Sequence, residues 1–384
     1  MSKTGIMICG HGSRSKAAER EFGLLAKGLK ARYPDTPVEY GFLEYSAPNI
    51  HMGLDALVDA GVERILAVPG MLFAATHARN DIPSVLTTYQ DKHPGLSIDY
   101  GRELGLHPSM IDAFEARILA ALGVDHVHDG DLYDTMLVVV GRGTSDIWAN
   151  AEAAKLCRIL CEKLGFGWAE TVYSGVTYPS VGRGLDMALK LGFKRVVVAP
   201  YFLFTGRLID RIYNYVDEVA KVRPDVTLLK AGYLKDQDHV IDTFVARIEE
   251  ARSGEFVDDN DLMASFKQRL ARGEVDVHHH HAEYQPNTDP DDDEAPGHDH
   301  SHSHDHSHGH DHSHSHDHSH GHSHGVYRHI AHPHGPRTMI DDNVCCCFMS
   351  QFPDQVIEEE RRLRSARSAK PLRDKMPELN TRAD

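Results

Sequence analysis

Short apolar runs alternate with amphipathic segments along the first part of the chain. Four apolar runs have lengths that suit buried strands, namely residues 6–9, 38–43, 64–69 and 96–100. Segments with the apolar spacing of helices follow them, at residues 15–31, 48–60, 79 onward and 108–122. Asp81 and Pro83 fall in the first turn of the third of these segments, where both residue types suit a helix start. Strands separated by helices predict an α/β fold with a parallel sheet covered on both faces.

The second half of the chain repeats this plan. Residues 136–145 resemble residues 6–14, and residues 195–200 resemble residues 64–69, with a shared offset of 131 residues. We therefore predict two tandem, similar, doubly wound lobes with a cleft between them. The first lobe is expected at residues 1–124 and the second at 134–273, joined by a linker at 125–133.

The composition changes after about residue 273. Residues 274–324 contain almost no large apolar side chains, hold twelve Asp or Glu and no Lys or Arg, and so supply −12 of the net charge of −16. We predict that residues 274–338 form an acidic, histidine-rich segment that is disordered without metal. Residues 339–384 form a last segment with adjacent cysteines and a charged, helix-like stretch at 354–373.

Composition and charge argue against several classes of function. No basic stripe runs through the ordered part, so nucleic acid is not an expected partner. No apolar run reaches the roughly 18–20 residues of a membrane helix, and no secretory signal begins the chain. The six cysteines are badly spaced for a disulfide framework, which favours a reducing cytoplasm. No P-loop is present, so ATP is not an expected cofactor.

His11 lies in a glycine-rich turn, residues 10–14, directly after the first predicted strand. Ligands of doubly wound sheets bind at the carboxyl ends of strands. The two glycines allow a sharp turn, and Ser13 can cap the next helix, whose free N–H groups attract anions. The alternative is a histidine that only hydrogen-bonds within its loop.

His77 follows the third predicted strand, and Glu44 follows the second. Because neighbouring parallel strands end at one crevice, both side chains are expected to approach His11. Two facing imidazoles bind a borderline divalent ion or accept protons near neutral pH. Glu44 can complete the ligand set or relay protons; a surface salt bridge is its alternative role.

The second repeat keeps the scaffold without these ligands. Arg142 stands at the position of His11, Leu208 (or Arg207 if one residue is skipped) at that of His77, and the position of Glu44 falls near Thr177. The first repeat is therefore expected to hold the active centre, with the second as the opposite wall. Arg142, Arg183 and Arg207 can receive carboxylates of an acidic substrate, or can be solvated surface residues.

Four motifs in order resemble one enzyme family. They are residues 8–14, 41–44, 69–83 and 104–108, with sequences Ile-Cys-Gly-His-Gly-Ser-Arg, Gly-Phe-Leu-Glu, Pro-Gly-Met-Leu-Phe-Ala-Ala-Thr-His through Asn-Asp-Ile-Pro, and Leu-Gly-Leu-His-Pro. The set is similar to the class II, ATP-independent chelatases, in particular the long-form, CbiX-type sirohydrochlorin cobaltochelatases, over about residues 4–250. The resemblance implies two α/β lobes around a cleft, paired catalytic histidines at His11 and His77, and the family's acidic residue at Glu44.

The resemblance also implies the reaction, which is insertion of Co(II) into sirohydrochlorin on the way to cobalamin. Cobalt, as substrate, is expected between His11 and His77 with Glu44 nearby, and neutral imidazole is a competent acceptor of the pyrrole protons. The residues expected to orient the carboxylates of the macrocycle are Ser13, Arg14, Arg79 and Asn80.

The tail adds a separate candidate metal site of alternating histidines. Fourteen imidazoles among Ser, Asp and Gly make a high-capacity, low-selectivity site for Co(II), Ni(II) or Zn(II). Storage or delivery of cobalt is the expected use; an acidic solubilising tail with incidental metal binding is the alternative. The histidines are His298, His300, His302, His304, His306, His308, His310, His312, His314, His316, His318, His320, His322 and His324.

Long-form relatives often carry a spaced cysteine motif that binds an iron–sulfur cluster. Here Cys345, Cys346 and Cys347 are contiguous, and three adjacent side chains do not easily converge on one ion. A cluster would need other ligands or a second subunit, as in a homodimer. Another metal or redox role, or no metal at all, are the alternatives.

Two rival functions remain open from the sequence. Iron insertion toward sirohaem uses the same residue types as cobalt insertion. A non-catalytic cobalt or nickel storage protein or metallochaperone would bind metal without turnover, but it leaves the pairing of His11 with His77 unexplained. A histidine phosphatase fits poorly, because its Arg-His-Gly motif needs an arginine where Gly10 stands.

Overall fold

The apolar runs form the strands of two parallel sheets in the computed structural model, which describes residues 3–175, 177–255, 261–275, 277, 355–356 and 358. One four-stranded sheet has the order β2-β1-β3-β4 and the other the order β6-β5-β7-β8. The strands are β1 (Thr4–Gly10), β2 (Val38–Phe42), β3 (Arg64–Pro69), β4 (Ser97–Tyr100), β5 (Thr135–Gly141), β6 (Trp168–Tyr173), β7 (Arg195–Pro200) and β8 (Thr227–Lys230). The predicted α/β class and the two similar lobes are confirmed.

Helices connect the strands, as the amphipathic segments predict. They are α1 (Lys16–Arg32), α2 (Ile50–Asp59), α3 (Ile82–Lys92), α4 (Pro108–Leu122), α5 (Ile147–Leu164), α6 (Val181–Lys190), α7 (Arg207–Val222), α8 (Asp238–Ser253) and α9 (Leu262–Ala271). A π-helical turn, η1 (His77–Asp81), precedes α3, so the helix expected near residue 79 begins with an irregular turn. Within the described residues, no helix is both long and apolar enough to cross a membrane.

The central strands are apolar on both faces because helices cover both. In β1, Ile6 and Ile8 face a core formed with α1, while Met7 and Cys9 face a second core formed with α2 and α3. This alternation is the period of two that a strand imposes on its side chains. Continuous apolar runs are therefore the expected pattern for these buried parallel strands.

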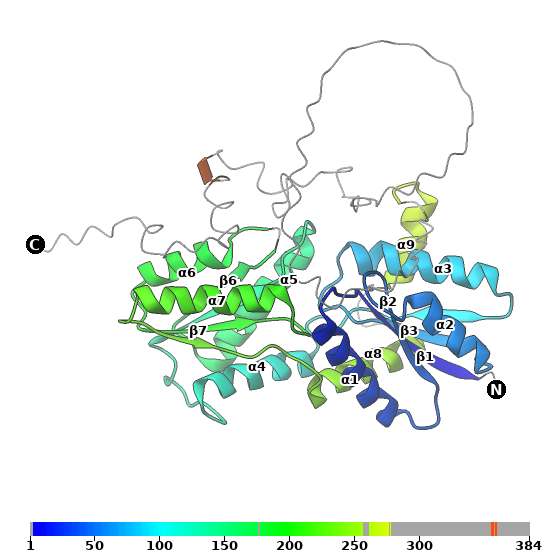
Figure 1. The fold of residues 1–384 in the computed structure, drawn as a ribbon, viewed down its shortest axis with the longest axis horizontal. Coiled ribbons are helices and arrows are strands. Elements are labelled where there is room, and N and C mark those ends of the chain that lie inside the picture. Colours follow the sequence, from blue (N-terminus) through cyan, green and yellow to red (C-terminus); the bar gives the residue numbers. More distant parts are fainter. Residues whose placement is uncertain are drawn as a thin grey trace, which may run out of the picture.

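Each sheet is covered partly by a helix from the other sequence repeat. Helix α4 follows β4 in the chain but packs against β7 and β8, whereas α8 follows β8 and packs against β3 and β4. Figure 1 shows α8 beside α1 and the strands of the first sheet, and α4 beside the second. We call the β1–β4 sheet with its covering helices the first lobe and the β5–β8 sheet with its covering helices the second lobe.

This exchange joins the lobes through one continuous apolar core. Leu25 of α1, Phe114 of α4, Leu160 of α5 and Phe244 of α8 are all fully buried in it. Polar contacts add to the joint: Glu21 on α1 accepts hydrogen bonds from the Thr205 N–H (2.8 Å) and the Tyr233 hydroxyl (2.7 Å) of the second lobe. The shared core and these hydrogen bonds fix how the two lobes face each other.

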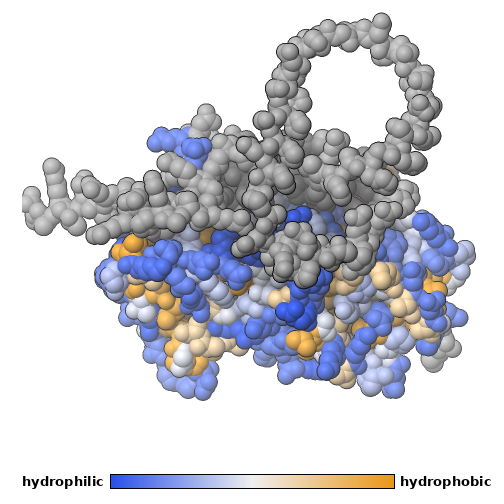
Figure 2. All heavy atoms as spheres, viewed as in Figure 1, coloured by the Kyte–Doolittle hydropathy of each residue, from blue (hydrophilic) through white to orange (hydrophobic). Residues whose placement is uncertain are grey.

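The outer surface mixes polar and apolar side chains. On the face shown in Figure 2, hydrophilic residues predominate over the described part, and hydrophobic ones occur in separate patches. The histidine-rich and cysteine-containing segments predicted at 274–338 and 339–384 lie almost wholly outside the described residues. Residues 355, 356 and 358, inside the predicted charged helix, are helical.

Candidate active site

His11 stands one residue beyond the carboxyl end of β1. Its imidazole Nδ1 lies 3.2 Å from the carbonyl oxygen of Gly12. A carbonyl oxygen only accepts, so Nδ1–H donates and the second ring nitrogen, Nε2, keeps a lone pair. That nitrogen lies 3.5 Å from a carboxylate oxygen of Glu44, and both side chains are about four-fifths buried.

Gly12 allows the loops after β1 and β2 to meet. Its φ of +97° lies in the left-handed region, and a Cβ there would overlap the carbonyl oxygen of Glu44. The buried Ser46 hydroxyl donates to the Ser13 carbonyl (2.8 Å) and accepts from the Ser13 N–H (2.9 Å). These contacts fix Glu44 beside His11. Ser13 was expected to cap α1, but the helix begins at Lys16 with Ser15 at the N-cap, and the Ser13 hydroxyl accepts from the Ser15 N–H instead.

His77 opens the π-helical turn η1 after β3. Its Nδ1 lies 2.7 Å from a carboxylate oxygen of Asp81, whose side chain is 1% exposed. Since an ionised carboxylate only accepts, Nδ1–H donates and Nε2 carries the lone pair. A carboxylate behind a histidine is the arrangement that orients many metal-binding imidazoles.

The three predicted ligands converge. One ligand atom from each of His11, Glu44 and His77 lies within 4.8 Å of the others. The two imidazole rings meet edge to face, with centroids 4.5 Å apart and an interplanar angle of 81°. Two imidazole nitrogens and one carboxylate oxygen form a donor set that suits Co(II), Fe(II) or Zn(II). Among the described residues, this is the one cluster of three such groups with that geometry.

His11 is held in its neutral form. Burial lowers its pKa well below the usual value, and the positive charge of Arg142 and the neighbouring His77 lower it further. Arg142 directly follows β5, so this positive charge comes from the second lobe. A neutral imidazole keeps the lone pair that a metal requires, so His11 remains competent to bind below its ordinary titration range.

The second lobe carries no copy of the ligand set at the equivalent positions. Gly10 pairs with Phe42 and Gly141 with Tyr173, which places Gly175 at the position of Glu44. The expected counterpart near Thr177 is therefore two residues too far along the chain. Gly175 approaches the carbonyl oxygen of Arg142 so closely that a Cβ would overlap it.

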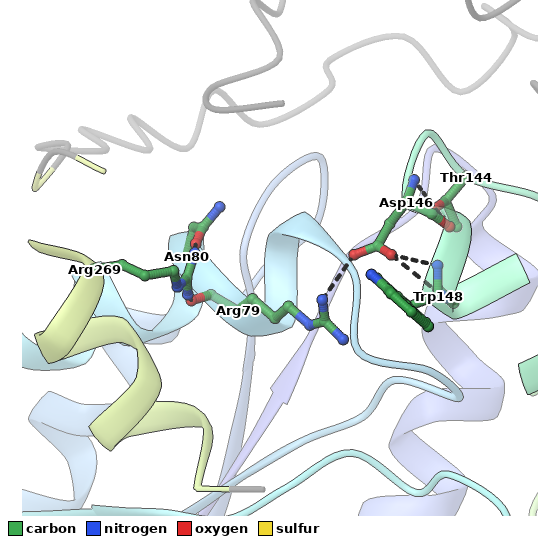
Figure 3. Close-up of polar contacts among 7 residues, drawn as sticks. Arg79, Asn80, Thr144, Asp146, Trp148 and Arg269 are labelled. Atoms are coloured by element: carbon green, nitrogen blue, oxygen red, sulfur yellow. Dashed lines mark hydrogen bonds and ion pairs between the residues drawn. The ribbon is translucent and has the colours of Figure 1, made fainter. Parts of the chain in front are cut away.

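Arg79 reaches from the first lobe to the second. Its guanidinium lies 3.0 Å from a carboxylate oxygen of Asp146, which also caps α5 by accepting from the N–H of Trp148. Figure 3 shows this ion pair between the lobes, and Trp148, near Asp146 in the chain, is 67% exposed. Arg14, another predicted substrate residue, lies over the ring of Tyr45 at 5.0 Å.

The Asn80 side chain points away from the ion pair between Arg79 and Asp146. Its carboxamide oxygen accepts from Arg269 of α9 (2.5 Å), as Figure 3 shows, and its side chain is buried. Its predicted role toward substrate, like those of Ser13, Arg14 and Arg79, stays a prediction. The alternating histidines at residues 298–324 and the cysteines at 345–347 lie outside the described residues.

Sequence reasoning missed three residues of this region. Asp81 was noted only as a helix-start residue, although its four-residue spacing from His77 on a helical segment is a usable signal. Trp148 and Arg269 had no signal, because nothing in their local sequence indicates which lobe they face.

Comparison with known proteins places this chain in a family. The model of the CbiX family matches residues 5–121 and 136–251, both repeats of the chain. The chain belongs to the CbiX family. The matches end before α9, so this helix and the rest of the chain lie beyond the matched repeats.

Relatives within the family differ in the metal that their names give. A sirohydrochlorin cobaltochelatase of Priestia megaterium is 33% identical over 252 residues, which cover 65% of this chain and 80% of the relative. A sirohydrochlorin ferrochelatase of the same organism is 28% identical over 253 residues, 65% of this chain and 92% of the relative. The structure of SirB from Bacillus subtilis with Fe3+ is 28% identical with a TM-score of 0.58, covering 67% of this chain and 100% of that one.

Proposed function

We propose that this protein inserts Co(II) into sirohydrochlorin without ATP. The observation that carries the proposal is the convergence of His11, Glu44 and His77 within 4.8 Å at the carboxyl ends of three neighbouring strands, in a chain of the CbiX family. Cobalt is the substrate metal and the reduced tetrapyrrole its acceptor.

The ligand set suits an ion that is held briefly and then given up. Two neutral imidazoles supply borderline ligands, and Glu44 offsets part of the positive charge. Three protein ligands leave coordination positions for water and for the incoming pyrrole nitrogens. The Asp81 carboxylate keeps the His77 ring in one orientation, so the ion meets preset ligands.

Proton balance follows from the same groups. Insertion forms bonds from Co(II) to the ring nitrogens, and two pyrrole N–H protons leave. As the ion passes to the macrocycle, each imidazole regains a lone pair that accepts a departing proton. Because burial and Arg142 lower the pKa of His11, its imidazolium is unfavourable and passes the proton on to Glu44 or water.

The rim of the site suits an acidic, planar substrate. Arg79 and Arg142 lie on opposite lobes, and both can bind carboxylates of the macrocycle. The bond from Arg79 to the Asp146 carboxylate marks a position where a substrate carboxylate can compete. The exposed indole of Trp148, in the first turn of the helix that Asp146 caps, offers an apolar surface for the ring system.

The choice of cobalt rests on the cobaltochelatase relative and on the alternating histidines of residues 298–324. Fourteen imidazoles concentrate borderline ions near the chain, so cobalt storage or delivery is part of the proposal. Deleting residues 278–324 is expected to preserve turnover at saturating cobalt and to lower it when cobalt is scarce. Loss of turnover under both conditions would contradict delivery.

The decisive experiment mixes purified protein with sirohydrochlorin and Co(II), without ATP, and follows the absorbance change on metallation. His11→Ala and His77→Ala are expected to lose at least about a hundredfold in rate, because each removes a ligand and a proton acceptor. His126→Ala, an exposed histidine of the interlobe linker, is the matched control and is expected to retain full activity.

Iron insertion is the second candidate, because a relative of similar coverage is named as a ferrochelatase. Parallel assays with Fe(II) under anaerobic conditions compare kcat/KM for the two ions. A larger value for iron would replace cobalt by iron in the proposal. No rate above the uncatalysed background with either ion would favour metal storage instead.

A further inference from the structure

Helix α9 packs on the turn that carries His77. It contacts η1 and α3, and its Leu262 and Phe266 side chains are buried. The sulfur of Met263 on α9 accepts a hydrogen bond from the Thr87 hydroxyl of α3 at 3.8 Å. This helix lies beyond the repeats that the family model matches.

One side chain of α9 reaches the middle of η1. Arg269 donates from Nη1 to the carboxamide oxygen of Asn80 at 2.5 Å and from Nη2 to the carbonyl oxygen of Arg79 at 2.7 Å. In Figure 3 the Arg269 side chain extends from α9 to Arg79 and Asn80. These two residues stand between His77, which opens the turn, and Asp81, whose carboxylate orients the His77 ring.

The contact is built despite an electrostatic cost. Partial burial lowers the pKa of Arg269, and the nearby Arg79 guanidinium lowers it further. A half-buried cation beside another cation is stable here because two bonds to oxygen acceptors offset the lost hydration. An arginine at a solvated position of α9 would avoid this cost. At its half-buried position, Arg269 instead joins α9 to the turn through its two hydrogen bonds.

We infer that Arg269 is a positioning residue for the metal site. By holding the backbone of Arg79 and the side chain of Asn80, it keeps η1 in the π-helical conformation that sets His77 opposite His11. The inference rests on the proposed metal-binding role of His77. It makes the affinity of the site for Co(II) depend on a helix outside the matched repeats.

The first test measures the turn directly and needs no turnover. Amide hydrogen exchange of the full-length protein is followed in peptides that cover residues 76–84, at free Co(II) concentrations set by a metal buffer. In the wild type, cobalt is expected to slow exchange in these peptides. Arg269→Ala is expected to exchange faster without metal and to need about tenfold more free Co(II) for the same protection, the low end for a group behind a ligand.

Two further variants control this measurement. Lys267→Ala removes a charge from an exposed position of the same helix and is expected to match the wild type. Arg269→Lys keeps the charge and can form one of the two bonds, so it is expected to lie between wild type and Arg269→Ala. Rapid exchange in the α9 peptides would reveal an alanine variant in which α9 no longer folds. In that case the test rests on the free Co(II) concentration that Arg269→Lys needs for protection.

The second test asks whether Arg269 acts through His77. Cobalt insertion is compared among wild type, Arg269→Ala, His77→Ala and the double variant. If Arg269 positions His77, Arg269→Ala raises KM for cobalt when His77 is present. The same substitution causes no further rise in KM when it is made in the His77→Ala variant. Equal losses in both backgrounds, or wild-type cobalt protection in the exchange measurement, would overturn the inference. Cobalt protection without any insertion would instead remove the proposed function and leave the inference standing.

Discussion

The bond between His77 and Asp81 allows a prediction of defined size. Asp81→Asn keeps the shape of the side chain but removes its charge, and the buried position (1% exposed) admits little water to replace it. The bond of 2.7 Å has the short length of a charge-assisted contact. Such bonds contribute roughly 1.5–3 kcal/mol, against about 0.5–1.5 kcal/mol for neutral ones. The midpoints of the two ranges differ by about 1.25 kcal/mol, which corresponds to just under tenfold in affinity, about eightfold.

The loss should appear in the use of cobalt. Initial rates of insertion are measured over a range of free Co(II), which a metal buffer fixes so that the histidine-rich segment does not deplete it. KM for cobalt is expected to rise about tenfold in Asp81→Asn, because the His77 ring loses its fixed orientation before the ion binds. The value of kcat should change less, since the substrate contacts that we propose on the second lobe are untouched.

Asp91→Asn is the matched control. Asp91 is an exposed carboxylate near the end of α3, so its replacement changes the net charge equally while leaving the His77 contact in place. We expect no change in its cobalt dependence. An Asp81→Asn variant that folds normally and has the wild-type KM for cobalt would refute the view that this carboxylate orients the ligand.

Three more outcomes follow from the site. Arg142→Ala should raise the pKa of His11 toward its ordinary value, because one cause of its lowering is removed; protonated His11 cannot bind metal, so the acid limb of the kcat/KM profile should move to higher pH. Gly12→Ala should lower the free energy of unfolding by more than the roughly 1–2 kcal/mol that a left-handed conformation costs a residue with a side chain. Gly61 is also left-handed but has open space around it, so Gly61→Ala should lower the free energy of unfolding by about 1–2 kcal/mol only. Trp148→Ala should raise KM for sirohydrochlorin severalfold in a titration of that substrate and leave KM for cobalt unchanged.

Much of the ligand set could be predicted from the sequence, for a topological reason. His11, Glu44 and His77 each follow an apolar run that forms a strand, and parallel neighbours in the order β2-β1-β3 end at one edge. Convergence of the three side chains then follows without knowledge of any helix packing. The repeat offset similarly predicted two lobes. Applied to Glu44 it leads to Gly175, as the strand register confirms, so the expected counterpart near Thr177 departed from the offset by two residues.

Other features depended on contacts between distant segments. The periodicity of α4 and α8 shows that each helix has a buried face but not which sheet covers it, so the exchange of these helices was not predictable. The same limit applies to Arg269, which lies 189 residues from its partner Asn80.

The sequence by itself therefore determined the α/β class, the repeat and the three converging ligands, because strand order and alternation act locally. Only the tertiary structure decided what holds those ligands in place. Asp81 behind His77, the effect of the Arg142 charge on His11 and Arg269 on η1 became visible only in three dimensions, because hydrogen bonds and charges depend on distance in space rather than along the chain.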